Sequence, residues 1–263
     1  IDPFVIFSNV FPWRRSAIYD TKRQNLPPSL AFLNKAVFFV SGLKRIVITG
    51  GPSAGKTTLL DLLQKQYGDR VAIAPEAASM LLRGGFMRPD TDADRVHTQR
   101  AIFSLQRELE AKAIAHCATT HGVCETKVSL FCDRGSMDGA AYWPGTAESF
   151  VAEMGTTVEH EYSRYSLVLH LQSAEEGRGY TRTEIRTESA SEAAQLDQLI
   201  ARGWGAHPNY VFIPNGDSFI AKLNEAFRIL EPNLPDRSLW IASQNPNERY
   251  ATLGDLLANE AAE

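Results

Sequence analysis

Short apolar segments alternate with amphipathic segments along the middle of the chain. The apolar ones are rich in β-branched and aliphatic residues, which is typical of buried parallel strands, and they cover residues 45–49, 70–74, 128–132, 166–171 and 209–213. A segment with helical character separates each strand from the next. Helical crossovers of this kind join parallel strands, and ligands then bind at the carboxyl ends of the strands. The pattern therefore predicts an α/β fold around one parallel sheet.

Two of the predicted helices carry apolar residues three or four positions apart on one face. The longer one covers residues 94–116, and its apolar positions are Ile102, Leu105, Leu109 and Ala113. The last helix covers residues 218–230, and its expected buried positions are Ile220, Leu223, Phe227 and Leu230.

Signals at helix ends mark the remaining helices. Residues 57–67 carry four leucines and stop at Gly68, and residues 75–82 form a short helix that stops at Gly84-Gly85. Capping boxes open two further helices, at Thr156-x-x-Glu159 and at Ser189-x-x-Glu192.

The pattern divides the chain into three parts. Four prolines interrupt residues 1–42, which we interpret as an N-terminal extension. Its aromatic side chains need a surface, either the domain or a neighbouring copy of the chain, and the second alternative implies a homodimer. Residues 43–231 form the predicted α/β domain, and residues 232–263 are a C-terminal tail.

Composition narrows the class of protein. The chain has 263 residues, 44% of them hydrophobic, which is enough for one α/β domain with appendages. Its net charge of −4 gives no overall positive field for a nucleic-acid backbone, so we expect no nucleic-acid partner. Three cysteines are too few for a disulfide framework and favour a cytoplasmic protein. No apolar run approaches the roughly 20 residues of a transmembrane helix.

One stretch carries a specific chemical signature. Residues 50–57 fit the phosphate-binding pattern G-x-x-x-x-G-K-[ST] between a predicted strand and a predicted helix. Glycines at its ends allow successive N–H groups to face phosphate oxygens at the helix N-terminus. Lys56 is expected to reach the β and γ phosphates, and Thr57 the Mg²⁺ ion. The predicted nucleotide contacts are Gly50, Gly51, Pro52, Ser53, Ala54, Gly55, Lys56, Thr57 and Thr58.

The third strand indicates how the triphosphate is used. It ends at Asp133, the second expected metal ligand, and Arg134 follows where many ATPases have a water-activating Glu. Arg134 cannot act as a base but can neutralise a transferring phosphoryl group, which favours transfer over hydrolysis; the alternative is an ordinary salt bridge.

Glu76 follows the second strand, where an acceptor should bind. It either accepts a hydroxyl proton or holds ribose hydroxyls, or else caps a helix or lies on the surface.

A later segment repeats arginine every four residues, at Arg178, Arg182 and Arg186. Such a segment suits a lid that closes on phosphates, with Arg182 and Arg186 as the candidate pair; a solvated charged loop is the alternative.

Asp138 either holds substrate or caps a turn. Residues 126–129 lack the Asp of a guanine-binding Asn-Lys-x-Asp element, which favours ATP over GTP.

Together these features resemble the AAA-domain-like P-loop family of ATPases and kinases of NAD metabolism, which is similar to the ribosylnicotinamide kinase domain. The resemblance covers residues 44–230. Besides the phosphate loop, it rests on Ala74-Pro75-Glu76-Ala77-Ala78, Cys132-Asp133-Arg134-Gly135, Gly139-Ala140-Ala141-Tyr142-Trp143-Pro144, Gly179-Tyr180-Thr181-Arg182 and His207-Pro208-Asn209-Tyr210.

More distantly, the chain is similar to deoxynucleoside and nucleoside monophosphate kinases. That resemblance implies a five-stranded parallel sheet in the order 2-3-1-4-5 with a lid. It also implies that Glu76 is the base and that Asp133 and Arg134 form the acidic-Arg pair. Gln106 or Gln99 on the long helix would then read the acceptor base.

The sequence thus predicts a Mg²⁺-dependent kinase that transfers the γ-phosphate of ATP to a hydroxyl of a small nucleoside-like or nucleotide-like metabolite. The predicted catalytic residues are Lys56, Glu76, Asp133, Arg134, Arg182 and Arg186, and the predicted metal ligands are Thr57 and Asp133. The alternative is a regulatory binding module that responds to ATP or GTP and has no small-molecule acceptor.

Overall fold

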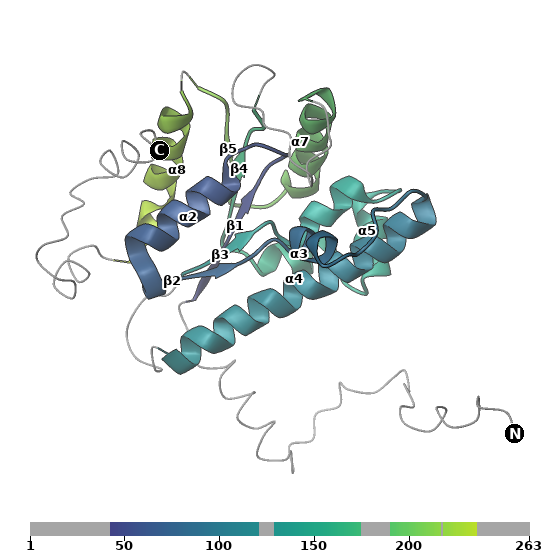
Figure 1. Ribbon diagram of the computed structural model, residues 1–263, viewed down its shortest axis with the longest axis horizontal. Coiled ribbons are helices and arrows are strands. Elements are labelled where there is room, and N and C mark those ends of the chain that lie inside the picture. Colours follow the sequence, from purple (N-terminus) through teal and green to yellow (C-terminus); the bar gives the residue numbers. More distant parts are fainter. Residues whose placement is uncertain (1–42, 121–128, 175–189, 217, 236–263) are drawn as a thin grey trace, which may run out of the picture. The chain divides into compact units, whose positions relative to one another are not determined.

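A computed structural model describes residues 43–120, 129–174, 190–216 and 218–235. Within these ranges five strands form one parallel sheet, as the pattern predicted, in the order β2-β3-β1-β4-β5 that the resemblance to nucleoside monophosphate kinases implied (Figure 1). The strands are β1 (Lys44–Thr49), β2 (Val71–Ala74), β3 (Ser129–Asp133), β4 (Leu167–Leu171) and β5 (Tyr210–Ile213).

The central strands are apolar because helices cover both faces of the sheet. Every residue of β3 and β4 is buried, and so are the last four residues of β1. The register places Ile48 beside Asp133 and Thr49 beside His170. The carboxyl ends of β1, β3 and β4 therefore meet at one edge of the sheet, where the candidate site lies.

One face of the sheet is covered by α2 (Lys56–Tyr67) and α8 (Phe219–Leu230), which lie side by side in Figure 1. Leu63 of α2 and Phe227 of α8 join one buried cluster with Ile46 of β1.

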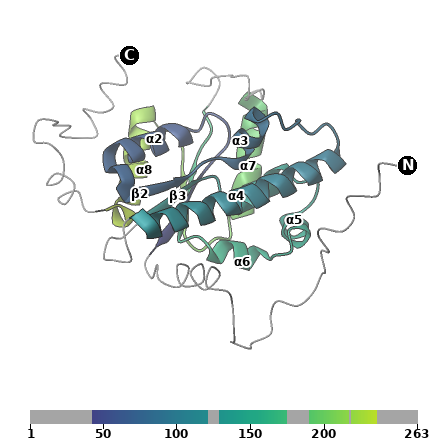
Figure 2. The ribbon, with the colours of Figure 1, turned by 60° about the horizontal axis from the view of Figure 1, so that its bottom comes forward.

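Helices of a second group cover the opposite face (Figure 2). Phe103, Phe150 and Trp204 come from three of them and form a second buried cluster with Val47 of β1. The helices of this side are α4 (Asp92–Thr120), α5 (Ala147–Glu153), α6 (Val158–Ser163) and α7 (Ala190–Trp204). Two shorter elements complete this side: α3 (Ala77–Arg83), which contacts α4, and the 3-10 helix η2 (Ser136–Tyr142), which contacts α4 and α7.

Two predicted apolar faces differ from the observed ones. Ile220 is 47% exposed, because the first turn of α8 is uncovered and burial begins at Lys222. Leu223, Phe227 and Leu230 are buried as predicted. On α4 the expected apolar residues are only half-buried, since the inward side is a mostly polar set: Thr98, Gln99, Phe103, Gln106 and Glu110.

The observed helix ends agree with some of the predicted ends, and one predicted helix begins later than expected. Gly68 and Gly84 end α2 and α3 as predicted. The helix predicted from the Thr156 capping box begins one residue later, because Thr157 accepts the hydrogen bond from the N–H of His160.

One helix was not predicted, and another begins at the edge of the described residues. The short helix α5 begins at an N-cap, Thr146, whose hydroxyl accepts from the N–H of Ser149. Ser189 lies outside the described residues, and α7 begins at Ala190.

No helix within the described ranges combines the length and the hydropathy that a membrane crossing requires.

Candidate functional site

The phosphate loop joins the carboxyl end of β1 to the N-terminus of α2. Gly50 and Gly55 have φ angles of 132° and 94°, which residues with a side chain rarely adopt. A Cβ added at Gly50 would lie 2.0 Å from the carbonyl oxygen of Leu171, so close packing also requires glycine there. The loop thus has the geometry that the motif predicts, with the helix N-terminus open to an anion.

Lys56 is buried inside this loop, with 7% of its surface exposed. Its Nζ donates hydrogen bonds to the carbonyl oxygens of Gly50 and Gly51, both at 2.9 Å. Burial, reinforced by the nearby Arg134 guanidinium, lowers the pKa of Lys56 to about 8. Among the described residues no carboxylate forms an ion pair with this ammonium group, and a phosphate group in the loop would supply an anionic partner.

Asp133 is the last residue of β3 and is 8% exposed. Among the described residues no donor pairs with its Oδ1 atom, which is buried. Burial raises the pKa of this carboxyl to about 6. An unpartnered buried carboxylate oxygen fits a hard divalent cation, and Thr57, an exposed residue at the start of α2, carries a hydroxyl oxygen and lines the pocket beside the loop.

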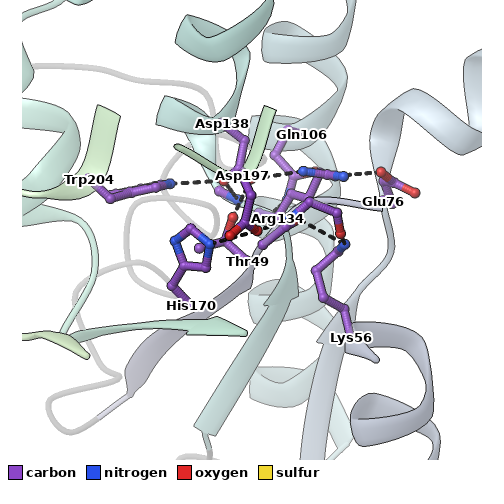
Figure 3. A network of polar contacts seen from close by, with 12 residues as sticks. Thr49, Lys56, Glu76, Gln106, Arg134, Asp138, His170, Asp197 and Trp204 are labelled. Atoms are coloured by element: carbon purple, nitrogen blue, oxygen red, sulfur yellow. Dashed lines mark hydrogen bonds and ion pairs between the residues drawn. The ribbon is translucent and has the colours of Figure 1, made fainter. Parts of the chain in front are cut away.

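Arg134 follows Asp133 in the left-handed conformation, with φ 69°. Its Nε atom donates to Glu76 Oε1 at 2.5 Å, and its Nη1 atom donates to Asp138 Oδ1 at 3.1 Å (Figure 3). Gln106 Nε2 donates to the Arg134 carbonyl oxygen at 3.1 Å. The arginine is therefore fixed at both its side chain and its backbone, and it carries the ion pair that the sequence left as an alternative.

Glu76 lies between β2 and α3, and its carboxylate faces Arg134 and not the helix N-terminus. Ser79 Oγ also donates to this carboxylate, at 2.5 Å. Burial alone would raise the pKa of Glu76, but the positive charges of Arg134 and Lys56 outweigh it and lower the pKa to about 2. Glu76 is thus an ionised hydrogen-bond acceptor that is a weak base.

Asp138 caps the turn after Arg134, which is one of its two predicted roles, and it also lines the pocket described below. Its carboxylate accepts from the N–H of Gly135 at 2.9 Å and from Trp204 Nε1 at 3.0 Å, and Thr49 Oγ1 also donates to it. Arg134 is the fourth donor, so each of the two carboxylate oxygens accepts two hydrogen bonds from within the protein.

A pocket of about 490 Å³ opens from the phosphate loop toward α4. Its inner end is polar, with Lys56, Thr57, Glu76 and Arg134. Its far wall is aromatic, and the rings of Phe103 and Trp143 meet the ring of Phe150 edge-on at 5.9 and 5.6 Å; Tyr142 also lines the pocket. Polar contacts at one end and ring surface at the other are what a small polar-aromatic ligand needs.

Several predicted residues are brought together here. Lys56, Thr57, Glu76 and Arg134 line the pocket, and Asp133 neighbours Arg134 in the chain. Gln99 and Gln106 line it too, but the Gln106 amide nitrogen is bonded to the Arg134 carbonyl. Arg178, Arg182 and Arg186 lie outside the described residues.

Sequence reasoning missed a buried contact behind the loop, between Asp197 of α7 and the N–H of Gly51. Two signals were available in hindsight. His170 is the one polar residue of a buried strand, and Asp197 falls on the buried stripe of α7 with Ala193, Ile200 and Trp204. A polar residue on an apolar face indicates a specific partner.

The strand order, the glycine loop between β1 and α2 and the buried Lys56 together define a P-loop NTPase with a kinase-like fold. A family model described as AAA domain matches residues 45–219, more than half of the chain, and the chain belongs to this family. No curated protein sequence matches the chain.

Solved structures with the same fold include two of the NadR protein. The structure of NadR in complex with NAD and AMP-PNP matches 76% of this chain and 52% of its own, with a TM-score of 0.55 and 15% identity. The structure of NadR in complex with NR matches 76% and 53%, with a TM-score of 0.55 and 14% identity. The chain therefore spans about half the length of these relatives.

Thymidylate kinase from Candida albicans matches 72% of this chain and 92% of its own, with a TM-score of 0.50 and 14% identity. At these identities the likeness shows the fold, which is that of P-loop kinases. The fold class and the resemblance to this family are thus confirmed.

Proposed function

We propose that this protein is a Mg²⁺-dependent kinase that transfers the γ-phosphate of ATP to a hydroxyl of a small nucleoside-like or nucleotide-like metabolite. The observation that carries the proposal is the pocket, which continues from the phosphate loop past Glu76 and Arg134 to an aromatic wall. ATP bound by the loop would leave the rest of the pocket free for a phosphate acceptor. A regulatory module that only binds a triphosphate needs no such space.

The donor would be held by the loop amides and by Lys56. Thr57 and Asp133 would hold the Mg²⁺ ion, which, when bound, neutralises charge on the β and γ phosphates. The unpartnered Oδ1 atom of Asp133 supports this ligand set.

On the acceptor side, Arg134 lies at the inner end of the pocket and would neutralise the phosphoryl group during transfer. Glu76 would accept a hydrogen bond from the acceptor hydroxyl and orient it. Its lowered pKa favours this orienting role over removal of a proton before transfer. Arg182 and Arg186 remain the predicted phosphate ligands of a lid.

The aromatic wall supports a planar group in the acceptor, because rings stack and pack edge-on with aromatic side chains. The fold shared with NadR, which was solved with NAD and with NR, supports a nucleoside-like metabolite. Gln99, which is buried at this wall, is the better candidate for reading the base.

The test combines ligand screening with one substitution. Thermal unfolding is measured with ATP, GTP and a nucleoside and nucleotide library, since a ligand of the folded state raises the melting temperature. Phosphorylation of each hit is then assayed by mass spectrometry.

For Glu76→Gln we expect ATP affinity close to wild type and a loss of transfer of about 100-fold, because the amide replaces the anionic acceptor of the hydroxyl hydrogen bond. Equal transfer by Glu76→Gln would remove Glu76 from the mechanism. ATP binding without phosphorylation of any compound would favour the regulatory module.

A further inference from the structure

Asp197 of α7 lies behind the phosphate loop and contacts it directly (Figure 3). The N–H of Gly51 donates to Asp197 Oδ1 at 2.8 Å, and both residues are buried. The same oxygen accepts from the N–H and the hydroxyl of Ser173, at 3.2 and 3.1 Å. One carboxylate oxygen thus joins α7, the loop and the residues that follow β4.

The sheet holds this carboxylate from the other side. His170 in β4 is fully buried, and its Nε2 atom lies 3.0 Å from Asp197 Oδ1. A carboxylate only accepts hydrogen bonds, so Nε2 carries a proton, and on the other side of the ring the Tyr210 hydroxyl of β5 lies 2.8 Å from Nδ1. The sheet therefore helps to fix the position of Asp197 through His170 of β4.

Gly51 is held at both of its polar backbone groups. Its N–H donates to Asp197, and its carbonyl oxygen accepts from Lys56 Nζ at 2.9 Å. Gly51 is also closely packed, since a Cβ added there would lie 2.2 Å from Ser173 Oγ. The peptide groups on either side of Gly51 are therefore each held by a hydrogen bond to a buried side chain.

We propose that Asp197 is a positioning residue for triphosphate binding: by accepting the Gly51 N–H, it holds the phosphate loop in the conformation that presents the other amides to the phosphates. The inference rests on the proposed function for the ligand, a nucleoside triphosphate. Its readout is binding and not transfer. A chain that binds ATP but phosphorylates nothing would refute the kinase and leave this role of Asp197 to be judged on affinity alone.

The test compares two substitutions of Asp197 by calorimetric titration of the full chain with ATP and Mg²⁺. Asp197→Leu keeps the approximate shape but leaves the buried Gly51 N–H without an acceptor, and we expect ATP affinity to fall at least about ten-fold. Asp197→Asn keeps an oxygen at the same place, and we expect affinity within about three-fold of wild type. Rescue by the conservative variant separates the accepted hydrogen bond from the charge.

Tyr210→Phe is the matched control. It removes a hydroxyl from the outer end of the same network, which contacts His170 and not the loop. We expect a lower melting temperature and unchanged ATP affinity. The proposal is overturned if Asp197→Leu binds ATP as tightly as wild type, if Asp197→Asn is weakened as much as Asp197→Leu, or if Tyr210→Phe loses the same affinity.

A second measurement decides the matter if Asp197→Leu does not fold. Amide hydrogen exchange of the Gly51 N–H is followed by NMR in the wild type and in Asp197→Asn, both without nucleotide. Slow exchange in both supports the proposal, because the amide is then held before any ligand arrives. Exchange of the wild-type amide at the rate of an exposed loop overturns it.

Discussion

At the scale of single residues, Lys56 has the most constrained environment. Its ammonium group is enclosed by the loop that it serves and donates to two carbonyl oxygens of that loop. The lowered pKa shows that these neutral oxygens compensate its burial only in part. A bound phosphate would complete the compensation, so the lysine and the triphosphate stabilise each other.

We therefore expect Lys56→Ala to weaken ATP binding by at least about ten-fold, the loss of a hydrogen bond between charged groups. Titration calorimetry measures it. Lys65→Ala is the control, because Lys65 is exposed on the same helix and its removal changes the net charge by the same amount as Lys56→Ala. Equal losses in the two variants would assign the effect to overall charge and not to the loop.

At the scale of elements, α4 is organised around buried charge. Glu110 is 1% exposed and accepts from Arg164 Nη2 at 2.6 Å and from the Tyr165 hydroxyl at 2.8 Å. Arg164 also donates to the fully buried Glu161. Burial raises the pKa of Glu110, while these partners act in the opposite direction. The arginine thus joins α4 to α6 through two carboxylates.

Removing that arginine leaves both carboxylates buried with one partner fewer. We expect Arg164→Met to lower the free energy of unfolding by about 3–5 kcal/mol, as is typical when one member of a buried ion pair is removed. Urea unfolding at neutral pH measures it. In the double variant with Glu110→Gln, part of the loss should be recovered, because one of the stranded charges is gone.

Arg228→Met breaks an exposed pair with Glu225 and serves as the control, for which we expect no measurable change in the urea midpoint. An Arg164→Met variant as stable as this control would mean that water solvates the two carboxylates.

Some elements could be predicted from the sequence, and others could not. The strands and the phosphate loop were predicted because their signals are local: apolar runs, and glycines at fixed spacing. The inward side of α4 was predicted only in part: Leu109 and Ala113 pack against the buried cluster, but Gln106 and Glu110 contact Arg134 and Arg164, which are distant in the chain. The contact between Asp197 and Gly51 spans 146 positions, so a polar residue on the buried stripe of α7 indicates that a partner exists but not that the partner is Gly51.

At the scale of the whole molecule, stability and ligand binding make opposite demands on one position. Asp133 has a buried oxygen without a partner among the described residues, and its raised pKa means that ionisation destabilises the ligand-free fold. The same oxygen is the one suited to a cation. The ligand-free chain is therefore less stable than its packing allows.

We expect Asp133→Asn to raise the ligand-free free energy of unfolding at neutral pH by roughly 1–3 kcal/mol. Because the folded pKa is raised, the native state binds more protons than the unfolded state between pH 4 and 6, so wild-type stability relative to the variant falls across this window as pH rises. Urea unfolding at a series of pH values measures the difference.

The same variant should lose the additional rise in melting temperature that Mg²⁺ gives over ATP alone. Asp61→Asn, an exposed substitution on α2, is the control for a change of one negative charge. A constant stability difference across the pH window would show that Asp133 does not titrate as its burial implies.

The left-handed backbone at Arg134 also limits how this position can evolve. Glycine is the residue that best tolerates a φ of 69°, so the backbone conformation alone would favour it. Glycine has no guanidinium group, and the bonds to Glu76 and Asp138 would be lost with it. Most other substitutions keep the backbone strain and lose the charge as well. Every substitution of Arg134 therefore keeps the backbone strain, loses the contacts with Glu76 and Asp138, or does both.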